Sequence, residues 1–145
     1  MPEAMGAGPP TIGERRWAAM STHAPDIQLK RIYDPVSRDD GMRVLVDRLW
    51  PRGIRKESAK LTLWLKEIAP SPKLREWFGH DPARFDEFSH RYRRELAANK
   101  EAVERLEHLL ELGRVTLLYA AHDAAHNHAL VLADYLRTAA REHAL

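Results

Sequence analysis

Val115-Thr116-Leu117-Leu118-Tyr119-Ala120-Ala121 is an apolar run that passes directly into His122-Asp123, and it decides how this chain folds. A run with almost no polar interruption is typical of a central strand covered on both faces of a sheet. A second run, Val44-Leu45-Val46, passes in the same way into Asp47-Arg48. Ligands of open α/β sheets bind at the carboxyl ends of the strands, so the residues after these two runs are where we expect a site.

The segments around the two runs predict an α/β fold. Residues 27–33 alternate like a half-buried strand near an edge of the sheet, and residues 43–49 form the next strand. Apolar residues at helical spacing, bounded by Ser, Pro, Asn and Gly signals, predict helices over about 58–68, 71–78, 81–96, 99–112 and 125–141. We expect a small three-layer α/β domain with a short, partly parallel sheet of about three strands and helices on both faces.

Composition narrows the classes of function. The chain of 145 residues contains no cysteine, which excludes disulfides, thiolate catalysis and cysteine-based metal sites. No stretch approaches the ~20 consecutive apolar residues of a membrane helix, so we expect no membrane contact and a cytoplasmic location. Residues 1–25 begin rich in Gly, Pro and Ala and are interpreted as a flexible tail, with Met20 as an alternative start. Residues 26–142 are then a single domain.

Charge is balanced overall and uneven locally. The formal net charge is +2, from 23 basic and 21 acidic residues. Residues 43–60 contain only two acidic residues against six basic ones, which are Arg43, Arg48, Arg52, Arg55, Lys56 and Lys60. This basic patch predicts contact with nucleic acid or an acidic partner, or else a solvated surface.

The exit of the first buried run offers three candidate residues. Asp47 and Arg48 lie on opposite faces of a strand, so one can enter a crevice while the other pairs locally. Arg52 lies between a proline and a glycine, and a guanidinium held on such a stiff turn suits a phosphate or a carboxylate. The structural alternative places both strand-end charges in ion pairs and Trp50 in the core.

The exit of the later run carries His122, Asp123, His126 and Asn127. Histidine titrates near physiological pH, so a neutral His122 or His126 suits an acid or a base. Asp123 could instead cap the last helix, which would explain it without any chemistry. His122, Asp123 and His126 also form a conceivable set of ligands for a divalent metal, and no other cofactor is predicted.

Two further residues could border the same crevice. His80 lies on a tight turn between two predicted helices, where Asp81 is most simply a helix cap. Arg91 precedes Glu95 by four residues, which is a favourable pairing distance on a helix. The alternative for both His80 and Arg91 is a purely structural role.

Several motifs taken together resemble the YeaO-like branch of the domain-of-unknown-function family 488 over residues 27–137. They are Val46 to Gly53, Trp64 to Ser71, Trp77 to Pro82, Phe88 with Arg91-Tyr92 and Glu95-Leu96, and Leu117 to Ala121 with Asp123, His126-Asn127 and Ala129. The resemblance implies a bacterial, cytoplasmic, single-domain α/β protein and no particular activity. The broader family has a late Cys-His-Arg motif, whereas this chain has His126-Asn127-His128, so no chemistry of that cysteine is carried over.

Three functional hypotheses remain open, together with the oligomeric state. In the first, the protein is a small enzyme, or a ligand-binding relative of one, that acts on an anion such as a nucleotide or nucleic-acid component. This hypothesis assigns catalysis to Asp47, His122, Asp123 and His126, and substrate binding to Arg48, Arg52, His80, Arg91 and Asn127. The second is a non-catalytic module that binds nucleic acid or protein through the basic patch. The third is a buried polar network of Asp47, Arg48, His126 and Asn127 that fixes the fold.

Overall fold

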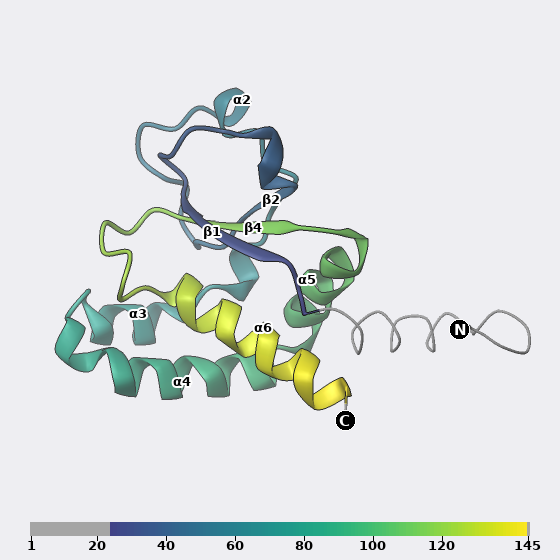
Figure 1. Ribbon diagram of the computed structural model, residues 1–145. Helices are drawn as coiled ribbons and strands as arrows, with labels where there is room; N and C mark the ends of the chain where they lie inside the picture. The colour runs from purple at the N-terminus through teal and green to yellow at the C-terminus, as the bar shows by residue number, and fades with distance from the viewer. Residues whose placement is uncertain (1–23, 145) are drawn as a thin grey trace, which may run out of the picture.

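The computed structural model describes residues 24–144, and their central feature is a four-stranded parallel sheet (Figure 1). The strands are β1 (Ile27–Arg31), β2 (Met42–Leu45), β3 (Leu63–Trp64) and β4 (Val115–Tyr119), in the order β1-β4-β2-β3. Each neighbouring pair runs parallel, and β1 is an edge strand. The α/β fold is therefore confirmed, with one strand more than expected in this part of the chain.

Five helices and three short turns surround the sheet within residues 24–144. They are α2 (Lys56–Ala59), α3 (Pro72–Phe78), α4 (Phe85–Ala98), α5 (Lys100–Leu112) and α6 (His128–Ala144), with 3-10 turns η1 (Arg38–Asp40), η2 (Lys66–Ile68) and η3 (Pro82–Arg84). Ser71 caps α3, because its hydroxyl accepts a hydrogen bond from Leu74 N–H at 3.2 Å. Gly79 ends α3 in the left-handed conformation. Asn99 precedes α5, but its side chain donates to Glu67 O rather than capping the helix.

The two faces of the sheet are covered very differently. Val44, Val46 and Leu117 belong to the main core, which contains apolar residues from α3 to α6. Leu45 and Leu118 alternate with them and face a smaller cluster that includes Ala59 of α2. Figure 1 shows α3, α4 and α6 on one side of the sheet and α2 on the other. Within residues 24–144, the second face is therefore covered by one short helix and loops rather than by a layer of long helices.

The helix predicted over 58–68 is wrong. The structure has α2, then the two-residue strand β3, then η2 in this segment. Leu61 and Trp64 pack on the face covered by α2, whereas Leu65 and Ile68 join the main core. These apolar residues pack on opposite faces of the sheet, yet they occur at the same spacing as residues on one face of a helix. Their packing against the sheet, rather than their spacing, determines the conformation of the segment.

The predicted tail of residues 1–25 lies almost wholly outside the described residues. Within residues 24–144, no helix combines the length and the apolar character that a membrane crossing requires.

Candidate functional site

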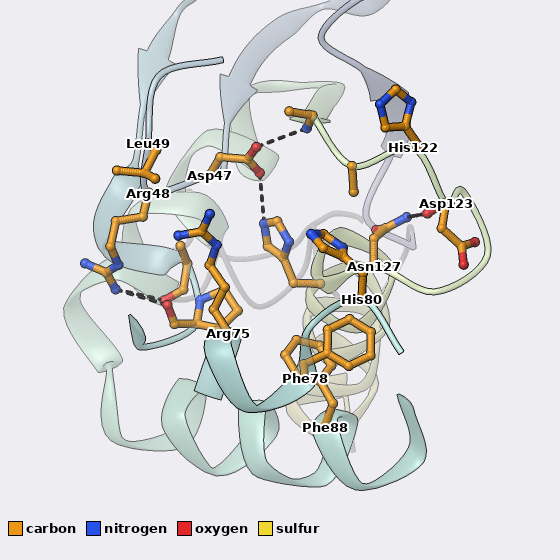
Figure 2. A pocket seen from close by; sticks show the side chains of 15 residues that line it. Asp47, Arg48, Leu49, Arg75, Phe78, His80, Phe88, His122, Asp123 and Asn127 are labelled. Carbon is orange, nitrogen blue, oxygen red and sulfur yellow. Dashed lines mark hydrogen bonds and ion pairs between the residues drawn. The ribbon is translucent and has the colours of Figure 1, made fainter. Parts of the chain in front are cut away.

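A pocket of about 430 Å³ opens where β2 and β4 end, at the place expected from the sequence (Figure 2). Its polar lining consists of Asp47, Arg48, Arg75, His80, His122, Asp123, Asn127 and His128. Its apolar lining consists of Leu49, Ala69, Pro70, Phe78, Phe88, Ala120 and Ala121. The fold thus brings both strand exits and the segments around α3 to one cavity.

Two side chains replace a backbone hydrogen bond at the mouth of the sheet. Val46 N–H donates to Leu118 O at 3.0 Å, and a regular parallel ladder would continue from Ala120 N–H to Val46 O. Instead, Ala120 N–H donates to Asp47 Oδ2 at 3.0 Å, and Nε2 of His128 lies 3.0 Å from Val46 O. Because Val46 O can only accept, the imidazole of His128 carries its proton on Nε2. The same nitrogen lies 3.2 Å from Asp47 Oδ1.

Arg48 lies on the same wall and is fixed by two carbonyl groups. Its Nη2 donates to Ala69 O at 3.2 Å and to Pro70 O at 3.3 Å. Its Nε is buried and makes no hydrogen bond with the described residues. A buried guanidinium N–H without an acceptor is costly to the fold, so the position of Arg48 depends on the two carbonyl groups that hold its Nη2.

Helix α4 fixes the carbonyl groups that hold Arg48. The Tyr92 hydroxyl donates to Ile68 O at 2.7 Å, and burial raises the pKa of Tyr92 well above its ordinary value. Glu95 accepts from Ser71 N–H at 2.8 Å and from the Ser71 hydroxyl at 2.6 Å. The segment between Ile68 and Ser71 is therefore anchored at both ends, which positions Arg48.

Arg75 supplies a second guanidinium to the pocket from α3. It is exposed, and within residues 24–144 its guanidinium has no hydrogen-bond or ion-pair partner. In the view of Figure 2, Arg75 and Arg48 both lie on the Asp47 side of the pocket, away from His122 and Asp123. Sequence reasoning missed Arg75, because an arginine on the surface of a short helix looks like any solvated cation.

Asp123 and Asn127 shape the loop after β4. Asp123 Oδ1 accepts from Ala125 N–H at 2.8 Å and from His126 N–H at 3.1 Å, and its Oδ2 lies 2.9 Å from His126 Nδ1. The bond from Ala125 and the contact with His126 lower the pKa of Asp123. Asn127 is the residue that caps α6, since its Oδ1 accepts from Leu130 N–H at 3.1 Å. The alternative that Asp123 caps this helix is wrong, because the helix begins four residues later than it would require.

The two histidines predicted as acid or base occupy different environments. His122 lines the pocket, and its Nδ1 lies 3.4 Å from Arg31 Nη2. His126 does not line the pocket and packs edge-on against Phe85, with ring centres 5.3 Å apart. Among the described residues, no three His, Asp or Glu side chains lie close enough to hold one metal ion. The conceivable set of His122, Asp123 and His126 is therefore not assembled.

The remaining predicted ligands divide between the pocket rim and the outer surface. His80 lines the pocket with a positive φ of 59°, which is unfavourable for a residue with a side chain. Arg52 is exposed outside the pocket, where its carbonyl accepts from the Tyr33 hydroxyl at 2.9 Å. Arg91 also lies outside, with its Nε 2.9 Å from Glu87 Oε2 and its guanidinium 4.2 Å from the Trp77 ring centre. The predicted pairing of Arg91 with Glu95 does not occur, because Glu95 binds the start of α3 instead.

His128 is the second pocket residue that sequence reasoning did not single out. It lies in the His126-Asn127-His128 segment, and its role comes from the contact of its imidazole with Val46 O, 82 residues earlier in the chain. The signal available was its position at the first turn of the helix that follows the central strand.

Comparison with known proteins shows which family this chain resembles. The family described as the inactive DUF488-N3 subclade matches residues 26–144. The chain is 47% identical over 113 residues to the uncharacterized protein YeaO of Escherichia coli, which covers 78% of this chain and 98% of that protein. It is 46% identical over 110 residues to uncharacterized proteins of Mycobacterium bovis and Mycobacterium tuberculosis, covering 76% of this chain and 92% of each relative. No solved structure matches.

Proposed function

Because the chain belongs to the inactive DUF488-N3 subclade, we propose that it is a non-catalytic binding protein that takes a small anionic ligand at the carboxyl ends of β2 and β4. Membership of this family, with the identity to YeaO, confirms the resemblance to the YeaO-like branch. The family itself has no assigned function, so the proposal rests on the pocket.

The observation that carries the proposal is the guanidinium of Arg75. It lines a pocket whose carboxylates, Asp47 and Asp123, already accept hydrogen bonds from Ala120, Ala125 and His126. The adjacent Arg48 also lines the pocket, with its Nη2 held by the carbonyl groups of Ala69 and Pro70. Two guanidinium groups in the lining of one cavity are suited to an anion, because Arg binds carboxylate and phosphate through paired hydrogen bonds.

The residues predicted as catalytic favour binding over catalysis. Asp47 accepts from the backbone of Ala120, and Asp123 holds the turn before α6. His126 lies outside the pocket lining. The sequence also contains no cysteine, and the subclade is described as inactive. Of the four predicted catalytic residues, His122 is the one that lines the pocket without supporting the backbone there.

The nucleic-acid or protein module is less well supported than the binding pocket. Arg43 of the basic patch is 4% exposed and pairs with Asp40 at 2.5 Å. Arg48 lines the pocket. The patch therefore keeps four exposed basic residues, which are Arg52, Arg55, Lys56 and Lys60. The exposed basic surface is therefore smaller than the six basic residues of the sequence predict.

A thermal-shift and titration series tests the proposal. Small carboxylates, phosphates and sulfonates are added to the wild-type protein, to Arg75→Gln and to Lys73→Gln. Lys73 is the matched control, because it is an exposed cation of the same helix outside the pocket. We expect at least one anion to stabilise the wild type and Lys73→Gln, and to do so much less for Arg75→Gln. Equal responses of all three proteins, or no response to any anion, would refute the proposal.

A further inference from the structure

We infer, on the basis of the proposed function, that the ligand is a singly charged carboxylate with an apolar body rather than a phosphate ester. The nature of the unused donors supports this choice. Proteins commonly bind phosphate groups through clusters of backbone N–H groups at helix N-termini. In this pocket, the clusters nearest the cavity are already occupied by carboxylates of the protein itself.

The start of α3 is the first of these clusters. Pro70, at its entrance, lines the pocket, and the next residue donates its N–H to Glu95 at 2.8 Å. Leu74 N–H is taken by the Ser71 hydroxyl, and Pro72 has no N–H. An incoming phosphate therefore finds a carboxylate already seated at this helix end.

The loop before α6 is the second cluster. Ala125 N–H and His126 N–H both donate to Asp123, and Leu130 N–H donates to Asn127. Among the side chains of the lining, Arg48 and Arg75 bring guanidinium groups to the cavity. A carboxylate can be bound by a guanidinium alone, since the two planar groups match in geometry.

The charges of the lining favour a single negative charge. Arg48 and Arg75 are balanced by Asp47 and Asp123 when the histidines are neutral. The Asp47 side chain is 17% exposed, so its repulsion of a second anion is only partly screened by water. Because the positive and negative charges of the lining balance, a second negative charge on the ligand gains no net attraction from the lining and still has to be desolvated, whereas one negative charge can pair with one guanidinium.

The apolar residues of the pocket define the rest of the ligand. Phe78 and Phe88 stack with ring centres 4.3 Å apart, and both line the cavity. Ala69, Ala120 and Ala121 add further apolar surface. A cavity of about 430 Å³ accommodates a ligand with an aromatic or branched aliphatic body next to its charged group.

Isothermal titration with three matched probes tests the inference: 3-phenylpropionate, 2-phenylethyl phosphate and 3-phenylpropionamide. The measurements use the full chain at pH 7.5, where a phosphate monoester carries nearly two charges. We expect the carboxylate to bind about tenfold more tightly than either other probe. We expect Arg75→Gln to lose about tenfold in affinity for the carboxylate, and Lys73→Gln to lose none.

The outcomes separate this inference from the proposed function. If the phosphate binds as tightly as the carboxylate and depends on Arg75, the anion pocket stands and the carboxylate assignment is wrong. If the amide binds as tightly as the carboxylate, charge is not recognised and both fail. If none of the three probes binds, the carboxylate assignment is wrong, and the thermal-shift series with the smaller anions decides whether the anion pocket stands.

Discussion

Asp47 and His128 meet in the gap between two strands, with Asp47 Oδ1 3.2 Å from Nε2 of His128. The backbone ladder between β2 and β4 ends with the bond from Val46 N–H to Leu118 O, and these two side chains satisfy the backbone groups of the next position. Asp47 accepts from Ala120 N–H, and His128 donates to Val46 O. Asp47 and His128 both line the pocket, so the pair supports the fold and borders the cavity at once.

Asp47→Ala is expected to destabilise the protein strongly. The substitution leaves Ala120 N–H without an acceptor and removes the carboxylate that faces His128. Ala120 N–H is partly buried, and a buried donor left unsatisfied costs about 1–3 kcal/mol. Urea unfolding should therefore show a loss of about 2 kcal/mol in the free energy of unfolding, while the exposed control Asp39→Ala changes by less than about 0.5 kcal/mol. Similar stability of the two variants would show that Asp47 does not hold the strands.

Asp40 is expected to determine how the free energy of unfolding decreases at acid pH. Burial alone would raise its pKa, but hydrogen bonds from Lys30, Ser37 N–H and Arg43 outweigh burial and lower the pKa from 3.8 to about 2. A lowered carboxyl pKa stabilises the folded state above the unfolded-state pKa, here by about 2 kcal/mol, and this contribution is lost as the pH falls from about 4 to about 2.

Urea midpoints measured from pH 7 to pH 2 test the role of Asp40. The wild type should lose stability steeply below about pH 4, and Asp40→Asn should be less stable at pH 7 and flatter over the acid range. If the stability of Asp40→Asn falls as steeply below about pH 4 as that of the wild type, other carboxylates cause the pH dependence.

His80 is expected to be held at the pocket rim at a cost in stability. Its φ of 59° lies in the left-handed region, which a side chain disfavours by about 1 kcal/mol relative to glycine. His80→Gly should be more stable than His80→Ala by about that amount, although both variants lack the imidazole. Chemical denaturation of the two variants measures the difference, and equal stabilities would argue against backbone strain at this position.

Arg52 and Arg91 are expected to make no contribution to ligand binding. Both were candidate binding residues, but Arg52 is exposed outside the pocket and Arg91 pairs with Glu87 over the Trp77 ring. Arg52→Ala and Arg91→Ala should bind the stabilising anion with wild-type affinity. A loss of about tenfold or more in either titration would show that the ligand extends beyond the cavity.

The position of the site was predictable, because it depends on the two apolar runs. The runs around Val44 and Val115 became β2 and β4, and their polar exits line one pocket. Local signals at Ser71 and Gly79 also predicted the ends of α3. Such features depend on residues close together in the sequence, which is why single-sequence reasoning reaches them.

Features decided by tertiary packing were not predictable. Trp64 and Leu65 face opposite sides of the sheet, and nothing in their spacing distinguishes that arrangement from a helix. Arg75 becomes a pocket residue only because α3 lies beside the strand exits, and His128 acquires its role by contact with Val46. These contacts join residues far apart in the chain, so hydrophobic periodicity and helix-capping residues, which are local, do not reveal them.

The most direct test of the anion pocket is to observe the two arginine side chains during a titration. In a ¹⁵N-labelled sample, the Nε–H resonances of Arg48, Arg75 and Arg91 are followed as 3-phenylpropionate is added. We predict that the resonances of Arg48 and Arg75 shift together with one dissociation constant, because both residues line the pocket, whereas that of Arg91 remains unchanged. Shifts confined to Arg91, or none at Arg48 and Arg75 while the protein binds the carboxylate, would place the anion elsewhere and contradict the account.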